Sequence, residues 1–224
     1  MTTDATPRLR ADARRNRDRI ITAARAVFTE HGTEVPMEEI ARAAGVGIGT
    51  LYRRFPDRES LLGAIGRDAF QQVLDEARAI GDHESDPWRA LCDFLLRAAN
   101  LRTVVRFSML SQRARAILAA DPEVEQAREE LLEILDGMVR AAQANGSMRP
   151  DVSGGDLGMI LSIVLQGVHI APDDIRPDAS ARYLTLMLDG LQARPGTPLP
   201  GRPVTIADIA LARHNAPAAD EQTV

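Results

Sequence analysis

The sequence predicts an all-α fold, and three observations carry that prediction. Apolar residues recur at the three- and four-residue spacing of amphipathic helices along most of the 224 residues. No segment of the sequence shows the sustained alternation of apolar and polar residues that is typical of strands. Two Asp-Pro pairs, at residues 86–87 and 121–122, repeat a helix start signal, an N-capping Asp followed by Pro at the first helical position.

The N-terminal quarter of the chain is expected to form one long helix and two short ones. The first helix covers about residues 10–31, and Gly32 ends it. Pro36 suits the start of a second helix that extends to residue 44. A turn at residues 45–47 leads to a third helix over 48–55, which ends because Pro56 disfavours helical geometry at the residue before it.

Longer helices are expected in the rest of the chain. They cover about residues 58–81, start at 87 and at 122, resume around 104–117, and extend over 157–171 and 177–193. Asp57 can cap the first of them, and Ser153 opens the apolar one. From residue 194 the chain is too rich in Pro and Gly for regular structure, except for one short helical segment over 205–213.

The composition is that of a folded protein and excludes several classes. Hydrophobic residues make up 45% and charged residues 26%, which excludes a disordered or collagen-like chain. The single cysteine, Cys92, cannot form an internal disulfide, and no Cys/His cluster has zinc spacing, so we expect no structural metal and no cofactor. Residues 1–19 lack the apolar core of a signal peptide, and the apolar stretch 157–171 is too short to span a bilayer. We therefore expect a cytoplasmic protein with no membrane partner.

The charge is distributed unevenly along the chain. The net charge is -5, yet residues 8–25 contain seven arginines against two aspartates, and lysine is absent from the sequence. A basic end on an acidic body is expected when one part of a protein contacts a polyanion. The alternative is an ordinary solvated tail.

The two short helices and their turn have the spacing of a helix-turn-helix. In that motif the second helix lies in the DNA major groove, where all four base pairs can be distinguished. Gly47 and Gly49 allow close approach of the backbone, and Leu51 and Phe55, four residues apart, face the core. Thr50, Tyr52, Arg53 and Arg54 supply polar groups for bases or phosphates. Alternatively, Arg53 and Arg54 are a solvated pair and Tyr52 is a packing residue.

Residues 20–62 resemble the N-terminal domain of the TetR/AcrR family of bacterial transcriptional regulators. The matching stretches are ARAVF and EHG within residues 24–32, MEEIARAAGV at 37–46, and GTLYRRFPDRESLL at 49–62. The resemblance implies a homodimer that binds a palindromic double-stranded DNA operator, acts as a repressor, and is released by a small-molecule effector. It also implies that the protein is not an enzyme.

The resemblance assigns DNA contacts by position. Base or near-base contacts fall on Ile48, Gly49, Thr50, Arg53 and Arg54, phosphate contacts on Tyr52 and Arg58, and an N-terminal arm on Arg14, Arg15 and Arg17. Two positions depart from the family pattern. Gly47 stands where Ser often caps the helix, and Ile48 stands where a polar or cationic residue is common, so Ile48 could only contact a thymine methyl or pack.

We therefore expect a helix-turn-helix DNA-binding domain over residues 10–56, a larger helical ligand-binding and dimerisation domain over 57–193, and a Pro/Gly-rich mobile tail over 194–224. Because the stretch 157–165 is apolar on all sides, it needs cover on two sides, which a second copy of the chain would supply. The expected dimer interface consists of Gly158, Ser162, Leu165, Tyr183 and Met187. The alternative is a central core helix in a monomer.

Candidate ligand contacts are mostly apolar side chains with two hydrogen-bonding groups in the late apolar helix. They are Trp88, Phe94, Phe107, Met109, Met138, Gln166 and His169. Each could instead be a plain core residue. Cys92 is expected to be buried beside Trp88 and Leu96, which raises the pKa of a thiol and argues against a redox sensor.

Two other functions remain open from the sequence. One is a constitutive DNA-binding protein without an effector, which a solid core in the second domain would favour. The other is an all-helical enzyme or ligand carrier. It has little support, because the four histidines form no HxxxH pair and no Gly-x-Ser-x-Gly motif is present.

Overall fold

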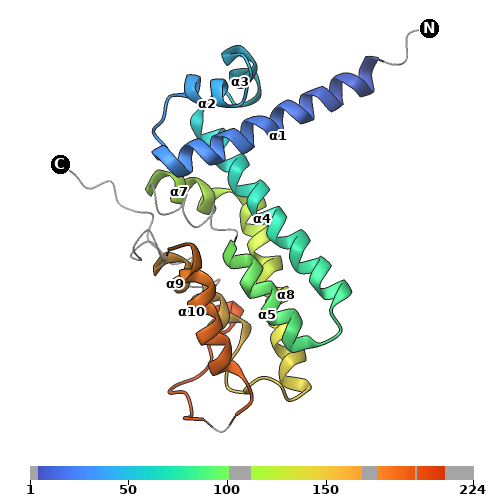
Figure 1. Ribbon diagram of the computed structural model, residues 1–224, viewed down its shortest axis with the longest axis vertical. Helices are drawn as coiled ribbons and strands as arrows, with labels where there is room; N and C mark the ends of the chain where they lie inside the picture. The colour runs from blue at the N-terminus through green and yellow to red at the C-terminus, as the bar shows by residue number, and fades with distance from the viewer. Residues whose placement is uncertain (1–4, 101–111, 168–175, 195, 210–224) are drawn as a thin grey trace, which may run out of the picture. The chain divides into compact units, whose positions relative to one another are not determined.

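The computed structural model describes residues 5–100, 112–167, 176–194 and 196–209 (Figure 1). Helices account for most of these residues, and among them no strand occurs beyond an isolated bridge between Met148 and Gln192. The helices are α1 (Ala5–His31), α2 (Met37–Ala43), α3 (Ile48–Arg54), α4 (Arg58–His83), α5 (Pro87–Asn100), α7 (Gln112–Ala120), α8 (Pro122–Ala144), α9 (Gly154–Gly167) and α10 (Arg176–Leu191). The predicted all-α fold is confirmed.

The chain divides into two compact units. One contains Met1–Gln72 with Leu101–Ala127, and the other contains Val73–Asn100 with Arg128–Val224. The first unit holds α1, α2, α3 and α7, and the second holds α5, α9 and α10, while α4 and α8 contribute to both. The boundaries between these units lie within α4 and α8. The domain boundary predicted from the sequence lies instead after residue 56, between the expected DNA-binding and ligand-binding segments.

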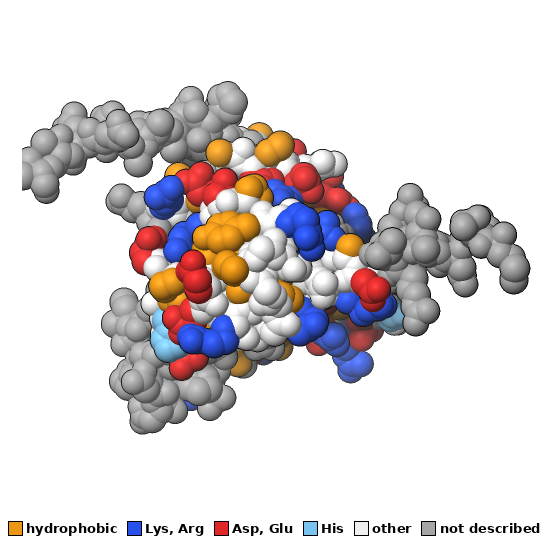
Figure 2. Space-filling view, turned by 90° about the horizontal axis from the view of Figure 1, so that it is seen from above, with side chains coloured by type: hydrophobic (Ala, Val, Ile, Leu, Met, Phe, Trp, Pro, Cys, Tyr) orange, Lys and Arg blue, Asp and Glu red, His pale blue; other side chains and the backbone are white. Residues whose placement is uncertain are grey.

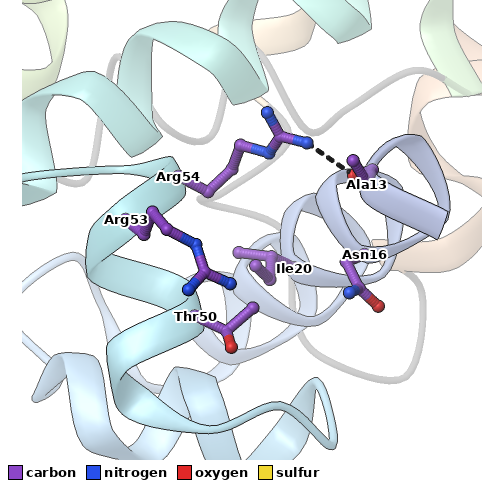
Figure 3. A pocket seen from close by; sticks show the side chains of 6 residues that line it. All are labelled: Ala13, Asn16, Ile20, Thr50, Arg53 and Arg54. Carbon is purple, nitrogen blue, oxygen red and sulfur yellow. Dashed lines mark hydrogen bonds between the residues drawn. The ribbon is translucent and has the colours of Figure 1, made fainter. Parts of the chain in front are cut away.

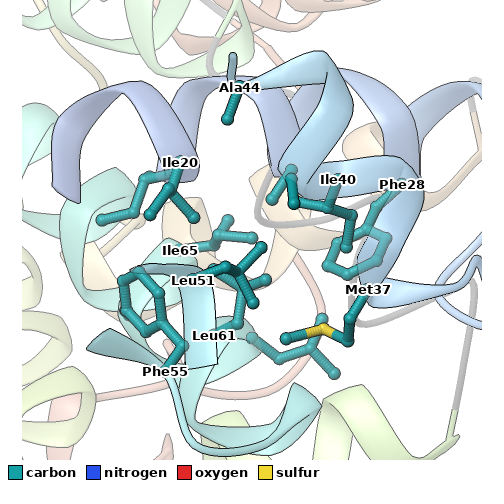
Figure 4. Packing of buried hydrophobic residues seen from close by; sticks show 14 of the residues in the cluster. Ile20, Phe28, Met37, Ile40, Ala44, Leu51, Phe55, Leu61 and Ile65 are labelled. Carbon is teal, nitrogen blue, oxygen red and sulfur yellow. The ribbon is translucent and has the colours of Figure 1, made fainter. Parts of the chain in front are cut away.

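The core of the first unit is formed by large apolar side chains from α1 to α4. Its fully buried members are Ile20, Phe28, Ile40, Leu51, Leu61 and Ile65 (Figure 4). Leu51 and Phe55 are both buried, as their four-residue spacing predicts. Burying a side chain of this size stabilises a fold by about 1.5–3 kcal/mol, so these contacts hold the two short helices, which could not persist alone.

Three aspartates act as the N-caps that the sequence predicts. The backbone N–H of Ser60 donates to Asp57 (2.7 Å) at the start of α4, and this bond lowers the pKa of the Asp57 carboxyl. Asp86 accepts from the N–H of Trp88 (2.9 Å), and Asp121 accepts from the N–H of Glu123 (3.0 Å). These bonds satisfy donors that have no partner within the helix, which sets where α4, α5 and α8 begin.

The core of the second unit is a separate apolar cluster. Its fully buried members include Leu91 and Leu95 of α5, Leu157 of α9 and Met148 of the connection before it. α5, α9 and α10 pack against one another around this cluster. α9 begins at Gly154, before the apolar run, because Ser153 and Asp156 form a reciprocal cap. The N–H of Ser153 donates to the Asp156 carboxylate (2.9 Å), and the N–H of Asp156 donates to the Ser153 hydroxyl (3.3 Å).

Residues 196–209, named the C-terminal strap here, are bound to the start of α9. The N–H of Val204 donates to Asp156 Oδ1 (2.9 Å), and its carbonyl accepts a hydrogen bond from the Ser153 hydroxyl. Gly155 lies directly beneath, where a Cβ would be 2.8 Å from the carbonyl carbon of Val204 and closer still to its oxygen. The absence of a side chain at Gly155 therefore permits this close approach.

The strap is also anchored by an arginine-aspartate pair. The Arg149 guanidinium donates to both oxygens of Asp151 (2.6 and 2.9 Å) and lowers the pKa of that carboxyl to about 2. Arg149 also donates to the carbonyl of Thr197 (3.0 Å), and the Leu199 N–H donates to Asp151 (3.4 Å). The described part of the segment that is predicted to be a mobile tail is therefore hydrogen-bonded to the second unit at several points.

Candidate nucleic-acid interface

The turn between α2 and α3 is built from backbone hydrogen bonds. At the end of α2, the N–H of Gly45 donates to Arg42 (3.1 Å) and that of Val46 to Ala41 (3.0 Å), with Gly45 in the left-handed region at a φ of 62°. This is a glycine-dependent helix termination. Gly47 is extended and precedes α3 without a side-chain cap, so the serine that often stands there in the family is not needed for the helix to start.

The two faces of α3 differ in exposure. Leu51 is buried in the first core, while Ile48 and Tyr52 are 39% and 42% exposed. Gly49, Arg53 and Arg54 are also exposed, and Thr50 is half-buried. Every α3 residue that the sequence assigns to DNA is therefore at least partly exposed.

A groove of about 300 Å³ lies between α1 and α3 (Figure 3). It is lined by Ala13, Asn16, Ile20, Thr50, Arg53 and Arg54. The side chains of Thr50 and Arg53 project from α3 toward the side of α1 that carries Asn16 and Ile20 (Figure 3). Hydroxyl, amide and guanidinium donors at one groove are suited to phosphate oxygens.

Two of the arginines assigned to DNA make hydrogen bonds within the first unit. Arg54 Nη2 donates to the carbonyl of Ala13 (2.9 Å), which links the end of α3 to α1 (Figure 3). Arg58 Nη1 donates to the carbonyls of Val35 (2.7 Å) and Thr33, in the connection between α1 and α2. Residue spacing does not predict these bonds, because their acceptors are backbone atoms 23 or more positions away along the chain.

The predicted N-terminal arm lies within α1, which starts earlier than expected. Arg14 and Arg15 are exposed, and Arg15 pairs with Asp12, one turn before it. Arg17 lies 3.6 Å from Asp18. In a space-filling view from above, arginines alternate with carboxylates and apolar side chains (Figure 2). Exposed ion pairs of this kind contribute little to stability, so their arginines can exchange partners at small cost.

The candidate ligand residues are only partly within the described structure. Phe107, Met109 and His169 lie outside the described residues, as does the side chain of Gln166. Phe94 is buried in the second core, and Trp88 and Met138 pack against it while partly exposed. None of these three lines the cavity of about 260 Å³ near the end of α4, whose lining is mostly charged: Glu76, Ala79, Ile80, His83, Glu84, Asp93 and Arg97.

The candidate dimer residues fall into different environments. Tyr183 and Ser162 are exposed, whereas Met187 packs against the second core. Gly158 lies against Leu132 and Ile209 of its own chain, where a Cβ would be 3.0 and 3.7 Å from their side-chain carbons. The side chain of Leu165 is outside the described residues.

Sequence reasoning missed the most exposed apolar side chains of the second unit. Ile163 of α9 is 63% exposed and Leu186 of α10 is 62% exposed, and Met159 is exposed on the same side of α9 as Ile163. The all-round apolar character of α9 was the available signal, because it predicts an outward apolar face without saying which residues form it.

Cys92 is half-buried beside the second core. Burial raises the pKa of its thiol to about 11, and the nearby carboxylates of Asp93, Asp86 and Asp189 act in the same direction. The thiol is therefore protonated at neutral pH and weakly nucleophilic.

Within the described ranges, no group of three or more His, Cys, Asp or Glu side chains is placed to hold a metal ion. In those ranges, no helix combines the length and apolar character that crossing a bilayer requires.

Comparisons with known proteins cover both parts of the chain. Residues 20–65 match the family model for bacterial regulatory proteins of the tetR family, and residues 86–193 match the model for the C-terminal domain of SbtR-like transcriptional regulators. The transcriptional repressor BepR of Brucella suis is 27% identical over 71% of this chain and 81% of its own length. The repressor KstR of Mycobacterium tuberculosis is 31% identical over 62% of this chain and 63% of its own length.

Solved structures agree with these matches. A TetR transcription regulatory protein from Mycobacterium vanbaalenii is 32% identical, with a TM-score of 0.59 over 82% of this chain and 99% of that one. A TetR transcriptional regulator from Streptomyces coelicolor is 33% identical, with a TM-score of 0.60 over 79% of this chain and 98% of that one. Both likenesses extend beyond the helix-turn-helix into the second unit.

Proposed function

This chain belongs to the TetR family of bacterial transcriptional regulators, and from that premise we propose that it is a dimeric repressor released from a palindromic operator by a small molecule. Members of this family are regulators of transcription rather than enzymes, and they bind DNA as dimers. The repressor assignment is supported by the names of BepR and KstR. A repressor of this kind works in the bacterial cytoplasm, where its operator is.

The exposed face of α3 carries the proposal. Leu51 and Phe55 anchor one side of α3 in the core. The opposite side therefore faces outward, and no large rearrangement of the domain is needed to expose it. We assign direct contact with bases to the exposed Arg53 and the half-buried Thr50, because both can donate to base edges in the major groove. Gly49 allows close backbone approach, and Ile48 can contact a thymine methyl.

Backbone phosphates are assigned to donors around this helix. Tyr52 of α3 and Arg14, Arg15 and Arg17 of α1 are the proposed phosphate contacts. For Arg54 and Arg58 to serve as DNA contacts, each would have to exchange or share its carbonyl partners. We therefore expect a smaller contribution to base recognition from Arg54 than from Arg53.

Dimerisation is assigned to the exposed apolar side of α9 and α10. Ile163, Leu186, Met159 and Tyr183 leave apolar surface in water that a second copy of the chain would cover. With two-fold symmetry, the two reading helices would enter successive major grooves about 34–36 Å apart.

The effector is proposed to bind within the second unit, near Trp88, Phe94 and Met138. These side chains are uncharged and lie in or against the second core, which favours a largely apolar ligand. By linkage, a ligand that prefers the conformation with poorly spaced reading helices must weaken operator binding, by no more than its differential affinity for the two conformations. A constitutive repressor without effector is the competing function.

Selection of bound duplexes from a random DNA pool, followed by sedimentation of the complex, tests the DNA assignment. The expected result is a palindrome bound by a dimer or by two dimers. Arg53→Ala should weaken binding to that duplex by about 1–3 kcal/mol, and the matched variant Arg42→Ala, an exposed arginine on α2, should not. If the purified protein enriches no sequence at moderate salt, the DNA assignment is wrong or a ligand already occupies the protein, and denaturing extraction with mass spectrometry distinguishes the two.

Sedimentation without DNA tests the dimer face. Ile163→Asp should yield monomers, because it places a charge in the centre of the proposed interface. Leu199→Asp is the matched control, since Leu199 is 48% exposed and belongs to the strap rather than to α9 or α10. Dimers in both variants would contradict the assignment.

A further inference from the structure

Arg19 of α1 makes two hydrogen bonds to the turn that precedes the reading helix. Its Nη2 donates to the carbonyl of Ala44 (2.8 Å) and to that of Gly45 (3.1 Å). Both carbonyls lie at the end of α2, where the last acceptors of a helix have no partner within it. A guanidinium at this end also interacts favourably with the helix dipole.

The other side-chain contacts of the turn are apolar: Ala44 is buried in the first core, and Val46 packs against it. α3 has no side-chain cap at Gly47, and it follows Gly45 after only Val46 and Gly47. The direction in which α3 leaves this turn therefore depends on the backbone at residues 44–47 as well as on the packing of Leu51 and Phe55 in the core. Because Arg19 is on α1, next to the fully buried Ile20, its bonds join this turn to the core of the unit.

Gly45 is matched to Arg19 in two ways. Its φ of 62° is in the left-handed region, which a side chain disfavours, and a Cβ there would lie 2.6 Å from Arg19 Nη2. Since the guanidinium is the flexible partner, a side chain at residue 45 would displace it from the two carbonyls. The glycine therefore supplies both the backbone conformation and the room for the arginine.

We propose that Arg19 is a positioning residue for operator recognition, which orients α3 through the carbonyls of Ala44 and Gly45 and does not itself contact DNA. The proposal rests on the function proposed above. It separates Arg19 from the other arginines of the basic stretch 8–25, which sequence reasoning treats as one group facing a polyanion. A phosphate contact from Arg19 is the competing role.

Binding to two duplexes at several salt concentrations distinguishes the two roles. The duplexes are the one recovered by selection and a scrambled duplex of equal length, and the variants are Arg19→Gln, Arg19→Lys and the charge control Arg42→Gln. Arg42 is exposed on α2, and its nearest carboxylate, on Glu39, is 3.9 Å away. Circular dichroism and thermal unfolding verify that each variant is folded.

Arg19→Gln should weaken binding to the selected duplex about tenfold or more, which corresponds to loss of one charged hydrogen bond. Its affinity for the scrambled duplex and its salt dependence should match those of Arg42→Gln. Arg19→Lys should recover part of the loss, because an ammonium can still donate to one carbonyl. Equal weakening on both duplexes, with the salt slope reduced by about one, would identify a phosphate contact and overturn the proposal. Unchanged affinity would overturn it as well.

A double-mutant cycle tests the coupling to Gly45. Alanine at residue 45 already displaces the guanidinium. The double variant Gly45→Ala/Arg19→Gln should therefore lose less binding free energy for the selected duplex than the sum of the losses in the two single variants. Additive losses would contradict the link between these residues.

Hydrogen exchange provides a test without DNA. In Arg19→Gln the amides of residues 45–47 should exchange faster, while those in the middle of α1 should not change. If the unsubstituted protein selects no duplex, the proposed function fails, and hydrogen exchange still decides whether Arg19 holds the turn. Unchanged exchange at residues 45–47 would refute that role.

Discussion

Replacing Gly155 with alanine tests whether the C-terminal strap is an integral part of the second unit. An alanine Cβ would lie 2.8 Å from the carbonyl carbons of Val204 and Thr205. Contacts this short to a Cβ atom are essentially never found in proteins. Both are backbone atoms, so no side-chain rotation can relieve the overlap. The strap would have to leave its position on α9.

The size of the effect follows from the hydrogen bonds that would be lost. Val204 donates to Asp156 and accepts from Ser153, and two such bonds contribute about 1 kcal/mol each to the free energy of unfolding. Alanine in place of glycine favours a helix by at most about 1 kcal/mol, and by less in the first turn. We therefore expect Gly155→Ala to destabilise the protein by about 1–2 kcal/mol.

Gly137→Ala is the matched control, because Gly137 lies inside α8 and a Cβ there would meet nothing within 4 Å. It should stabilise the protein by up to about 1 kcal/mol. Urea unfolding followed by circular dichroism measures both variants, and hydrogen exchange at the Val204 amide reports release of the strap. A Gly155→Ala variant as stable as Gly137→Ala would refute the close contact between the strap and α9.

Three further predictions concern the core, the arm and the thiol. Leu51→Ala should lower the free energy of unfolding by about 2–5 kcal/mol in urea, because Leu51 is fully buried between the reading helix and α1; a loss below about 1 kcal/mol would contradict that packing. Arg14→Ala and Arg15→Ala should weaken binding to every duplex and lower its salt slope, and two variants that match the parent at all salt concentrations would exclude a phosphate role. Cys92 should react slowly with iodoacetamide at pH 8 and faster as the pH approaches about 11, because its raised pKa keeps the thiol protonated; rapid labelling at pH 7 would contradict its burial.

The signals that predicted correctly are local in the sequence. Asp57, Asp86 and Asp121 cap helices two or three residues ahead, and Leu51 and Phe55 share a face because they are four residues apart. The helix-turn-helix follows the same logic, since its helix lengths and its turn are decided by Pro36, Gly45 and Pro56 and their neighbours. This is why the fold class and the family resemblance could be read from the sequence.

The arginines show where local signals end. The spacing of Arg19, Arg54 and Arg58 is equally compatible with contacts to DNA and with hydrogen bonds within the chain. Each of these arginines donates to a backbone carbonyl that is 23 or more positions away along the chain. A carbonyl has no residue identity, so no pattern of residue types predicts which arginine it will accept from. Only the packing of α1, of the two short helices and of the start of α4 within the first unit brings these groups together.

Within the described residues, the sequence by itself determined the helices, the helix-turn-helix and the family, while the predicted helical residues 104–111 and 168–171 lie outside that part of the chain. Tertiary structure alone decided which charged side chains are engaged within the chain, which apolar side chains of α9 and α10 remain exposed, and where the strap binds. The strap illustrates the physical reason. The Pro and Gly residues at 196–203 exclude a regular helix there, but the bonds from Val204 to Ser153 and Asp156 join positions 51 and 48 residues apart. Such bonds depend on the three-dimensional path of the backbone, which short-range sequence spacing does not encode.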